Sequence, residues 1–202
     1  MSAKVALFSV LFCFGLQKAT IHAQKSRLLT SKCDMAYDGI DLKTKKYRSE
    51  TMPAPWFEYT PSELKNQLRE NDLMECTAQV ALLGDKYFIN LNIQINSMIA
   101  EKEYGSIERG NILQILFVDG KEITLKGRNA SQGILNQQRN GYVYAVAYTL
   151  PENHFKKLRS IEVDKIGIQW SSGLEKYVIY ELDLIMNQLN CIINKRENKT
   201  RS

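Results

Sequence analysis

Histidine is scarce in this chain, whose 202 residues include only two, His22 and His154. Imidazole is the usual general base and the commonest metal ligand near neutral pH, so this scarcity restricts the available chemistry. No Gly-x-Ser-x-Gly nucleophile motif accompanies His154, and no clustered histidines or paired cysteines provide a zinc-binding set. We therefore expect no metal, no cofactor and no catalytic triad, and we interpret His154 as a surface residue without a chemical role.

Long apolar runs are also lacking, with one exception near the N-terminus. Lys4 precedes an apolar stretch over residues 5–16, and a short polar stretch then ends at the small residue Ala23. These 12 apolar residues are too few to cross a bilayer, which takes about 20, but the pattern is typical of a secretory signal peptide. We predict a cleaved signal peptide over residues 1–23, no transmembrane segment in the mature chain, and export to the periplasm, the cell surface or the medium.

Neither sign of charge dominates the mature chain. Loss of Lys4 and Lys18 with the signal peptide reduces the 27 basic residues to 25, against 22 acidic ones, which leaves a charge of +3. No basic stripe with interleaved aromatic residues is present, so we expect no nucleic-acid partner. The positive excess lies at the C-terminus, where we expect residues 197–202 to form a polar, basic, solvated tail. Attraction of this end to anionic lipid or polysaccharide is the alternative.

Cysteines are also scarce. After residue 23 the chain has an odd number of them, namely Cys33, Cys76 and Cys191. Three cysteines allow one intramolecular disulfide at most. Alternation of apolar and polar residues over 74–82 places Cys76 on the buried face of a strand, where a thiol can remain as a small hydrophobic side chain. Cys191 lies half a turn from the apolar face of the last predicted helix and needs a partner. We predict a Cys33–Cys191 disulfide, with Cys33–Cys76 as the alternative.

What the chain does have is a series of short segments typical of β-strands. Residues 86–96 alternate most regularly, because Tyr87, Ile89, Leu91, Ile93 and Ile95 fall on one face. We predict that this strand pairs with residues 74–83 across Gly84-Asp85. Further strands are expected over residues 111–118, 121–126, 141–150, 161–170 and 175–180, and short helices over 61–71, 151–160 and 181–195. Residues 24–46 lack periodicity and are expected to be mostly irregular.

This pattern predicts a mainly β fold. Many short strands with turn residues between them favour an antiparallel β-sandwich or partial barrel. Two or three short helices, including an amphipathic C-terminal helix, would cover an open edge or face of the sheet. We expect a single β-rich domain over residues 24–196.

Tyr142, Tyr144 and Tyr148 form a candidate aromatic face, because they lie on one side of the strand predicted over residues 141–150. If exposed, such rings could stack on sugars or on a partner peptide. If buried, they are ordinary sheet packing, and the small apolar residues opposite them favour this interpretation.

Carboxylates are the remaining catalytic candidates. Glycoside hydrolysis needs two acids that face one cleft, whereas the acids of this chain are scattered along it. Asp34, Asp38 and Asp41 cluster near the mature N-terminus and faintly suggest calcium binding, without EF-hand spacing. An acidic turn held by Asx hydrogen bonds is the favoured interpretation.

Several segments also resemble a known group of proteins. The segments are residues 33–38 (CDMAYD), 41–46 (DLKTKK), 84–88 (GDKYF) and 150–168, a predicted helix followed by a strand. They resemble a large group of small exported, uncharacterised proteins of Bacteroidetes-type bacteria, which have a Cys-Asp-Tyr start and a Phe-Thr-Gly-Lys-Lys-like stretch. Lys45 stands where that group has glycine. The resemblance implies a periplasmic or surface location and a β-rich fold, and it brings no catalytic residues.

These features predict an exported, non-catalytic envelope or secreted module that binds a protein or glycan of the cell envelope. The alternative is a carboxylate-based hydrolase acting on glycans. That activity would need two acids in one cleft at the separation that glycosidases use.

Overall fold

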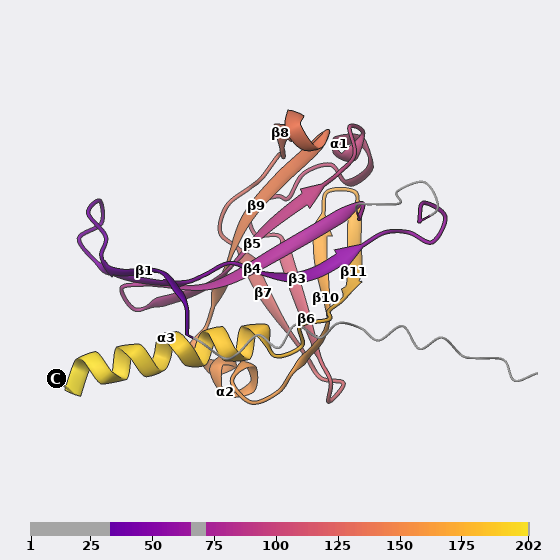
Figure 1. Ribbon diagram of the computed structural model, residues 1–202. Helices are drawn as coiled ribbons and strands as arrows, with labels where there is room; N and C mark the ends of the chain where they lie inside the picture. Colours follow the sequence, from indigo (N-terminus) through magenta and orange to yellow (C-terminus); the bar gives the residue numbers. More distant parts are fainter. Residues whose placement is uncertain (1–32, 66–71, 202) are drawn as a thin grey trace, which may run out of the picture. The chain divides into compact units, whose positions relative to one another are not determined.

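The structure is a computed structural model that describes residues 33–65 and 72–201. All of these residues belong to one compact unit. The predicted signal peptide lies outside the described residues, so it stays a prediction. Within the described ranges the chain forms one antiparallel sheet of 11 strands with three α-helices (Figure 1). The sheet runs from β1 at one end to β11 at the other and does not close into a barrel.

The strand order differs from the order along the chain. From one end of the sheet to the other, the strands are β1 (Met35–Ile40), β2 (Tyr47–Thr51), β4 (Met74–Leu83), β5 (Lys86–Ile95), β9 (Gly141–Leu150), β7 (Glu122–Gly127), β6 (Ile112–Phe117), β10 (Val163–Trp170) and β11 (Gly173–Val178). Two more strands pair outside this path, β3 (Ala54–Tyr59) with β4 and β8 (Ile134–Asn136) with β9. The helices are α1 (Ala100–Tyr104), α2 (Phe155–Leu158) and α3 (Leu184–Arg201), with short 3₁₀ turns η1 (Gln137–Arg139) and η2 (Glu152–His154).

Each of the long strands β4 and β9 pairs with two different strands along one of its edges. Along β4, the C-terminal half pairs with β2 and the N-terminal half pairs with β3. The two neighbours β7 and β8 divide one edge of β9 in the same way. In addition to its pairing with β4, β3 lies beside β11 (Figure 1). The rings of Phe57 from β3 and Tyr177 from β11 stack there with centroids 4.6 Å apart. The predicted mainly β fold, with an antiparallel sheet and a C-terminal helix, is therefore confirmed.

The core follows the predicted alternation of β4 and β5. The five residues expected to face inward from β5 are all at most 4% exposed: Tyr87, Ile89, Leu91, Ile93 and Ile95. Phe88, which lies on the opposite face of β5, is also only 5% exposed. The Arg128 guanidinium lies 4.4 Å above the centre of its ring, so an aliphatic and cationic side chain shields Phe88 from water.

Helix α3 is hydrogen-bonded to the sheet through the side chain of one glutamine, Gln188. The edge of β4 has no strand partner between the end of β2 at Thr51 and the start of β3 at Ala54. Gln188 from α3 fills this break, because its side-chain oxygen accepts a hydrogen bond from the Val80 N–H at 2.9 Å. Its amide nitrogen donates to the carbonyls of Met52 and Ala78, at 3.2 and 3.3 Å. The Thr51 hydroxyl also accepts from the Val80 N–H, at 3.1 Å, so Gln188 and Thr51 together satisfy the backbone groups at this break.

Both cysteine predictions are confirmed. A disulfide joins Cys33, just before β1, to Cys191 of α3, with Cα atoms 5.4 Å apart. Cys76 is a free thiol that is 1% exposed. Burial raises the pKa of that thiol, so it is held neutral and behaves as a small apolar side chain.

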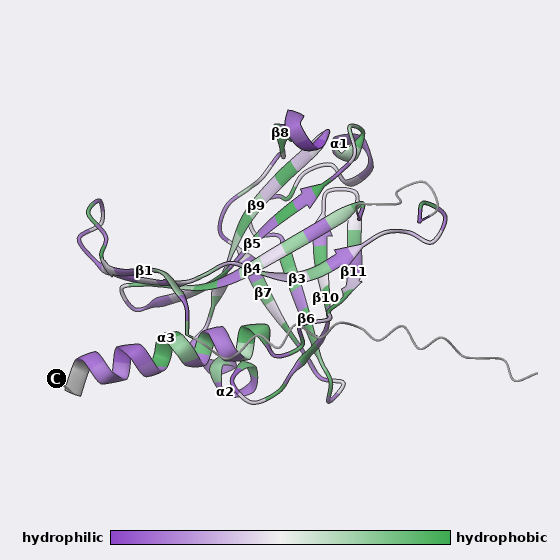
Figure 2. Ribbon diagram, in the orientation of Figure 1, coloured by the Kyte–Doolittle hydropathy of each residue, from purple (hydrophilic) through white to green (hydrophobic). Residues whose placement is uncertain are grey.

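Three local expectations need correction. Residues 35–46 were expected to be irregular, but they form β1 and the turn that leads into β2. Helix α1 was not predicted, and residues 62–65 of the helix expected over 61–71 form a turn, with residues 66–71 outside the described ranges. The C-terminal helix begins at Leu184 and continues to Arg201, through most of the segment expected to be a tail. Figure 2 shows this last part of α3 as strongly hydrophilic.

Candidate functional site

The hairpin of β1 and β2 extends beyond the other strands, beside the C-terminal part of α3 (Figure 1). Nearly every side chain of β1 is exposed, because the hairpin leaves the core at Ser49 and Thr51, the buried residues of β2. A two-stranded ribbon is marginally stable on its own in water. Here β2 also pairs with β4 through Arg48, Ser49 and Glu50, and polar contacts on both faces of the hairpin add to this support.

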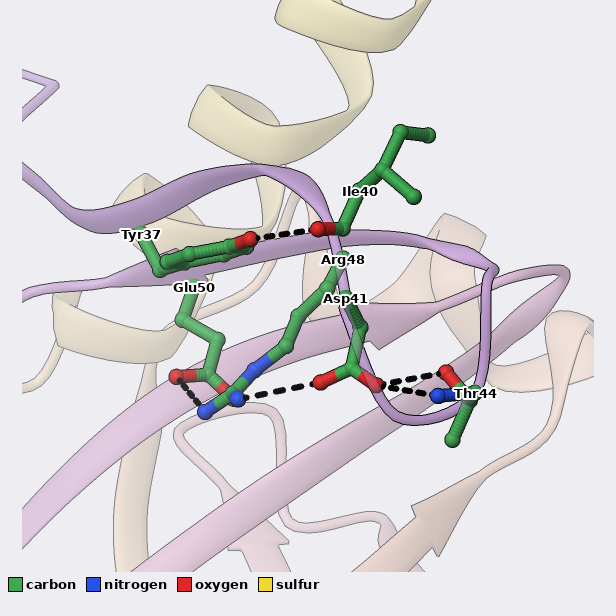
Figure 3. A network of polar contacts seen from close by, with 6 residues as sticks. All are labelled: Tyr37, Ile40, Asp41, Thr44, Arg48 and Glu50. Carbon is green, nitrogen blue, oxygen red and sulfur yellow. Dashed lines mark hydrogen bonds and ion pairs between the residues drawn. The ribbon is translucent and has the colours of Figure 1, made fainter.

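The turn at the tip is built around Asp41. Its carboxylate accepts hydrogen bonds from the backbone N–H and the hydroxyl of Thr44, at 2.7 and 2.8 Å (Figure 3). The Lys45 N–H donates to the Asp41 carbonyl, and Lys45 adopts a left-handed conformation with φ of 58°. The hydrogen bonds from Thr44, with further help from Arg48, hold the pKa of Asp41 below its ordinary value, so this side chain remains an anion that organises the turn.

Arg48 braces one face of the hairpin (Figure 3). Its guanidinium makes two hydrogen bonds with the Glu50 carboxylate, at 2.8 and 2.7 Å, and a longer contact of 3.4 Å with Asp41. It also lies 5.2 Å from the centre of the Tyr37 ring, whose hydroxyl donates to the Ile40 carbonyl at 2.7 Å. One planar cation therefore links β1, the turn and β2.

Asp38 and Lys199 brace the opposite face. The ammonium of Lys199, from α3, lies 2.9 and 3.0 Å from the two carboxylate oxygens of Asp38 and 4.7 Å from the centre of the Tyr47 ring. The Tyr47 hydroxyl also donates to Asp38. Burial raises the pKa of Asp38, but the hydrogen bonds from Tyr47 and Lys199 outweigh it and leave that pKa below its ordinary value. With the Cys33–Cys191 disulfide, this contact fastens the hairpin to α3.

The tip itself presents apolar and basic side chains to solvent. Leu42 is 82% exposed and Ile40 is 55% exposed. Leu42 is followed in sequence by the exposed residues Lys43, Lys45 and Lys46, and residues 42–46 include no acid. We define residues 40–46 as the tip and treat it as the candidate functional site.

A carboxylate cluster lies elsewhere, where β3 ends and β4 begins. Partial burial raises the pKa of Glu58, a hydrogen bond with Tyr180 opposes this rise, and the charges of Asp72 and Glu75 add to it. Asp72 accepts a hydrogen bond from Thr60 at 2.6 Å, and Glu75 pairs with Arg139 at 2.6 Å. These three acids, which are separated along the sequence, therefore lie close together in the fold.

A shallow pocket of about 260 Å³ lies where the β4–β5 turn meets the end of β9. Its lining includes Asp85 and Glu152 together with Lys86 and Arg128. Because both signs of charge are present, the pocket has no preference for a ligand of one charge.

The structure places the candidate aromatic face in the core. Tyr144 and Tyr148 are 0% exposed, and Tyr142 packs against the core cluster. The Tyr144 hydroxyl donates to the Gly105 carbonyl at 3.0 Å, and Tyr148 accepts from Asn111 at 2.7 Å. The rings of Tyr144 and Tyr148 therefore offer no stacking surface to a sugar or peptide, as the sequence favoured, whereas Tyr142 is partly exposed.

Asp34, Asp38 and Asp41 do not converge on one point. Asp41 faces Thr44 and Arg48, whereas Asp38 faces Tyr47 and Lys199 on the other side of the hairpin. Among the described residues no group of three or more histidine, cysteine, aspartate or glutamate side chains could hold a metal ion. His154 ends η2, is partly buried, and donates its backbone N–H to Pro151.

Comparisons with protein families, with curated proteins and with solved structures find no match for this chain. The resemblance to exported Bacteroidetes-type proteins therefore stays a prediction. Across residues 33–65 and 72–201, no helix is long and apolar enough to cross a membrane.

Proposed function

We propose that this chain is an exported, non-catalytic binding module of the cell envelope or the medium, and that the tip of the β1–β2 hairpin is its contact surface. The observation that carries the proposal is the exposure of Leu42, 82%, at the end of a hairpin held by polar contacts on both faces. Full burial of a leucine side chain is worth about 1.5–3 kcal/mol. A partner that covers Leu42 would gain much of this free energy.

The bracing of the hairpin supports the same function. A flexible loop loses conformational entropy when a partner orders it, which weakens binding by about 0.5–1.5 kcal/mol for each immobilised side chain. Asp41, Arg48 and Lys199 hold the backbone of the hairpin in one shape before any partner arrives. Such a preorganised tip is suited to binding, and none of its contacts requires a reacting group.

Photo-crosslinking from the tip tests this function. A photoreactive amino acid at position 42, in cells that export the protein, is expected to form an adduct with one envelope component. The matched control carries the same amino acid at position 118, because Val118 is 53% exposed in the turn of a different hairpin, β6–β7. Equal labelling from both positions, or no adduct from position 42, would contradict the proposal.

The carboxylate cluster favours a second candidate function, a hydrolase acting on glycans. Glu58 has a raised pKa, which suits a general acid, and Asp72 and Glu75 lie close enough to contribute to that shift. This function predicts a release of reducing sugar from envelope glycan that Glu58→Gln abolishes. Glu122→Gln, at an exposed glutamate of β7, is the matched control and should leave the release unchanged. The binding function predicts no release that depends on Glu58.

A further inference from the structure

We infer that the tip of the β1–β2 hairpin docks on the surface of an anionic lipid bilayer, with Leu42 inserted between the headgroups. This inference rests on the proposed function and names the partner of the same site. It differs from the attraction considered for residues 197–202, because the docking element is a folded hairpin and not the C-terminal end.

The positive charge of the tip favours an anionic surface as its partner. The tip contains Lys43, Lys45 and Lys46, all exposed, and its single acid is Asp41. The Asp41 carboxylate is directed toward Thr44 and Arg48, away from Ile40 (Figure 3). The outer end of the hairpin therefore presents an excess of positive charge to its partner. Each lysine or arginine near an anionic membrane surface contributes about 1 kcal/mol to binding.

The exposed aliphatic side chains distinguish a bilayer from an anionic polysaccharide. A polysaccharide would pair with the lysines, but sugar rings stack on aromatic side chains, and residues 40–46 include none. Leu42 and Ile40, at 82% and 55% exposed, are stabilised only by transfer into an apolar phase. Insertion of apolar side chains together with neighbouring cations is the general pattern of interfacial membrane binding.

The shape of the tip supports insertion. Ile40 projects from the hairpin on the side opposite to Asp41 and Arg48 (Figure 3), so its side chain is not covered by the polar network. Within the turn, the hydrogen bonds of Asp41 and Lys45 satisfy backbone groups that insertion would remove from water. Leu42 can therefore enter the headgroup region without leaving these groups unpaired.

Vesicle flotation with the purified mature protein tests this inference. The probes are vesicles of pure phosphatidylcholine and vesicles of an equal mixture of phosphatidylcholine and phosphatidylglycerol. We expect binding to the mixed vesicles only, weakened by added salt. Leu42→Asp is expected to reduce the affinity about tenfold or more. Lys43→Glu with Lys46→Glu should reduce it by a similar factor and remove most of the salt dependence.

Two matched variants control for general effects. Val118→Asp places the same charge on an exposed apolar residue of another turn, and Lys176→Glu reverses an exposed charge on β11. Both should bind the mixed vesicles as the unchanged protein does. Far-ultraviolet circular dichroism should show all variants folded, so a loss of binding reports on the tip.

Other outcomes overturn the inference in distinguishable ways. Absence of vesicle binding together with a protein adduct from position 42 would remove the lipid partner and leave the proposed binding function standing. Vesicle binding that survives Leu42→Asp but weakens with salt would indicate attraction to the anionic headgroups alone, and would refute the insertion of Leu42. Absence of both vesicle binding and a crosslinked adduct would refute the inference and the function on which it rests.

Discussion

Lys45 holds a backbone conformation that suits glycine better than lysine. Its φ of 58° lies in the left-handed region, where a Cβ atom crowds the following carbonyl at a cost of about 1–2 kcal/mol. Within the described ranges, the turn gains no stabilising contact from the lysine side chain, so the positive charge that it adds to the tip explains a lysine at this position.

This conformation gives a prediction at the residue scale. Replacement of Lys45 by glycine should raise the free energy of unfolding by about 0.5–1 kcal/mol, because relief of the crowding exceeds the extra chain entropy of glycine. Denaturant unfolding would measure the change. Lys43→Gly, in the same turn without a positive φ, should bring no gain. A Lys45→Gly protein that is less stable than the unchanged protein would show that the lysine side chain makes a stabilising contact.

Helix α3 acts at the element scale as a substitute for a missing stretch of strand. The chain between β2 and β3 contains Pro53, which has no N–H to donate to a neighbouring strand. Gln188 supplies one acceptor and two donor hydrogens at this break. Because Gln188 is 8% exposed, water cannot easily replace it.

We therefore predict that Gln188→Ala lowers the free energy of unfolding by about 1–2 kcal/mol, the cost of its lost buried hydrogen bonds, because the Thr51 hydroxyl still accepts from the Val80 N–H. Asn187→Ala, at the exposed neighbouring position, should change it by no more than about 0.5 kcal/mol. Chemical denaturation gives both values, and amide exchange at Val80 should be faster in the Gln188 variant alone. Equal effects of the two substitutions would argue against the role of Gln188 in the sheet.

The two hairpins β4–β5 and β1–β2 show which elements a sequence can reveal. In β4 and β5 one face is buried, so apolar residues recur at every second position and the strands were predicted within a residue of their ends. In β1 nearly all side chains are exposed, so burial imposes no such alternation. The polar contacts that hold β1 in place leave no periodic signal.

The candidate site was only partly predictable for the same reason. The spacing of Asp41 and Thr44 is local, and it supports the Asx turn that the sequence favoured over a calcium loop. Lys199 reaches Asp38 across 161 residues, and no pattern near either residue indicates that pairing. The tyrosine stripe was correctly placed on one face of β9, but its burial depends on neighbouring elements such as the α1 end at Gly105.

At the scale of the whole molecule, the disulfide joins residues 158 positions apart. Replacing Cys33 and Cys191 together by serine should lower the free energy of unfolding by about 2–5 kcal/mol, because so long a loop gains much chain entropy when released. The measurement is denaturant unfolding with and without reductant. Reductant should destabilise the unchanged protein by a similar amount and leave the double variant unaffected. A double variant that is still sensitive to reductant would point to a different bridge.

The position of Cys76 between the two bridged cysteines sets a condition on the timing of oxidation. A growing chain emerges from its N-terminus, so Cys33 and Cys76 are both present before Cys191 has been made. During that interval an oxidant would join the two wrong thiols, unless β4 and β5 have already paired and enclosed Cys76. The native bridge therefore requires that Cys76 be enclosed, or stay unoxidised, until the last helix has been made.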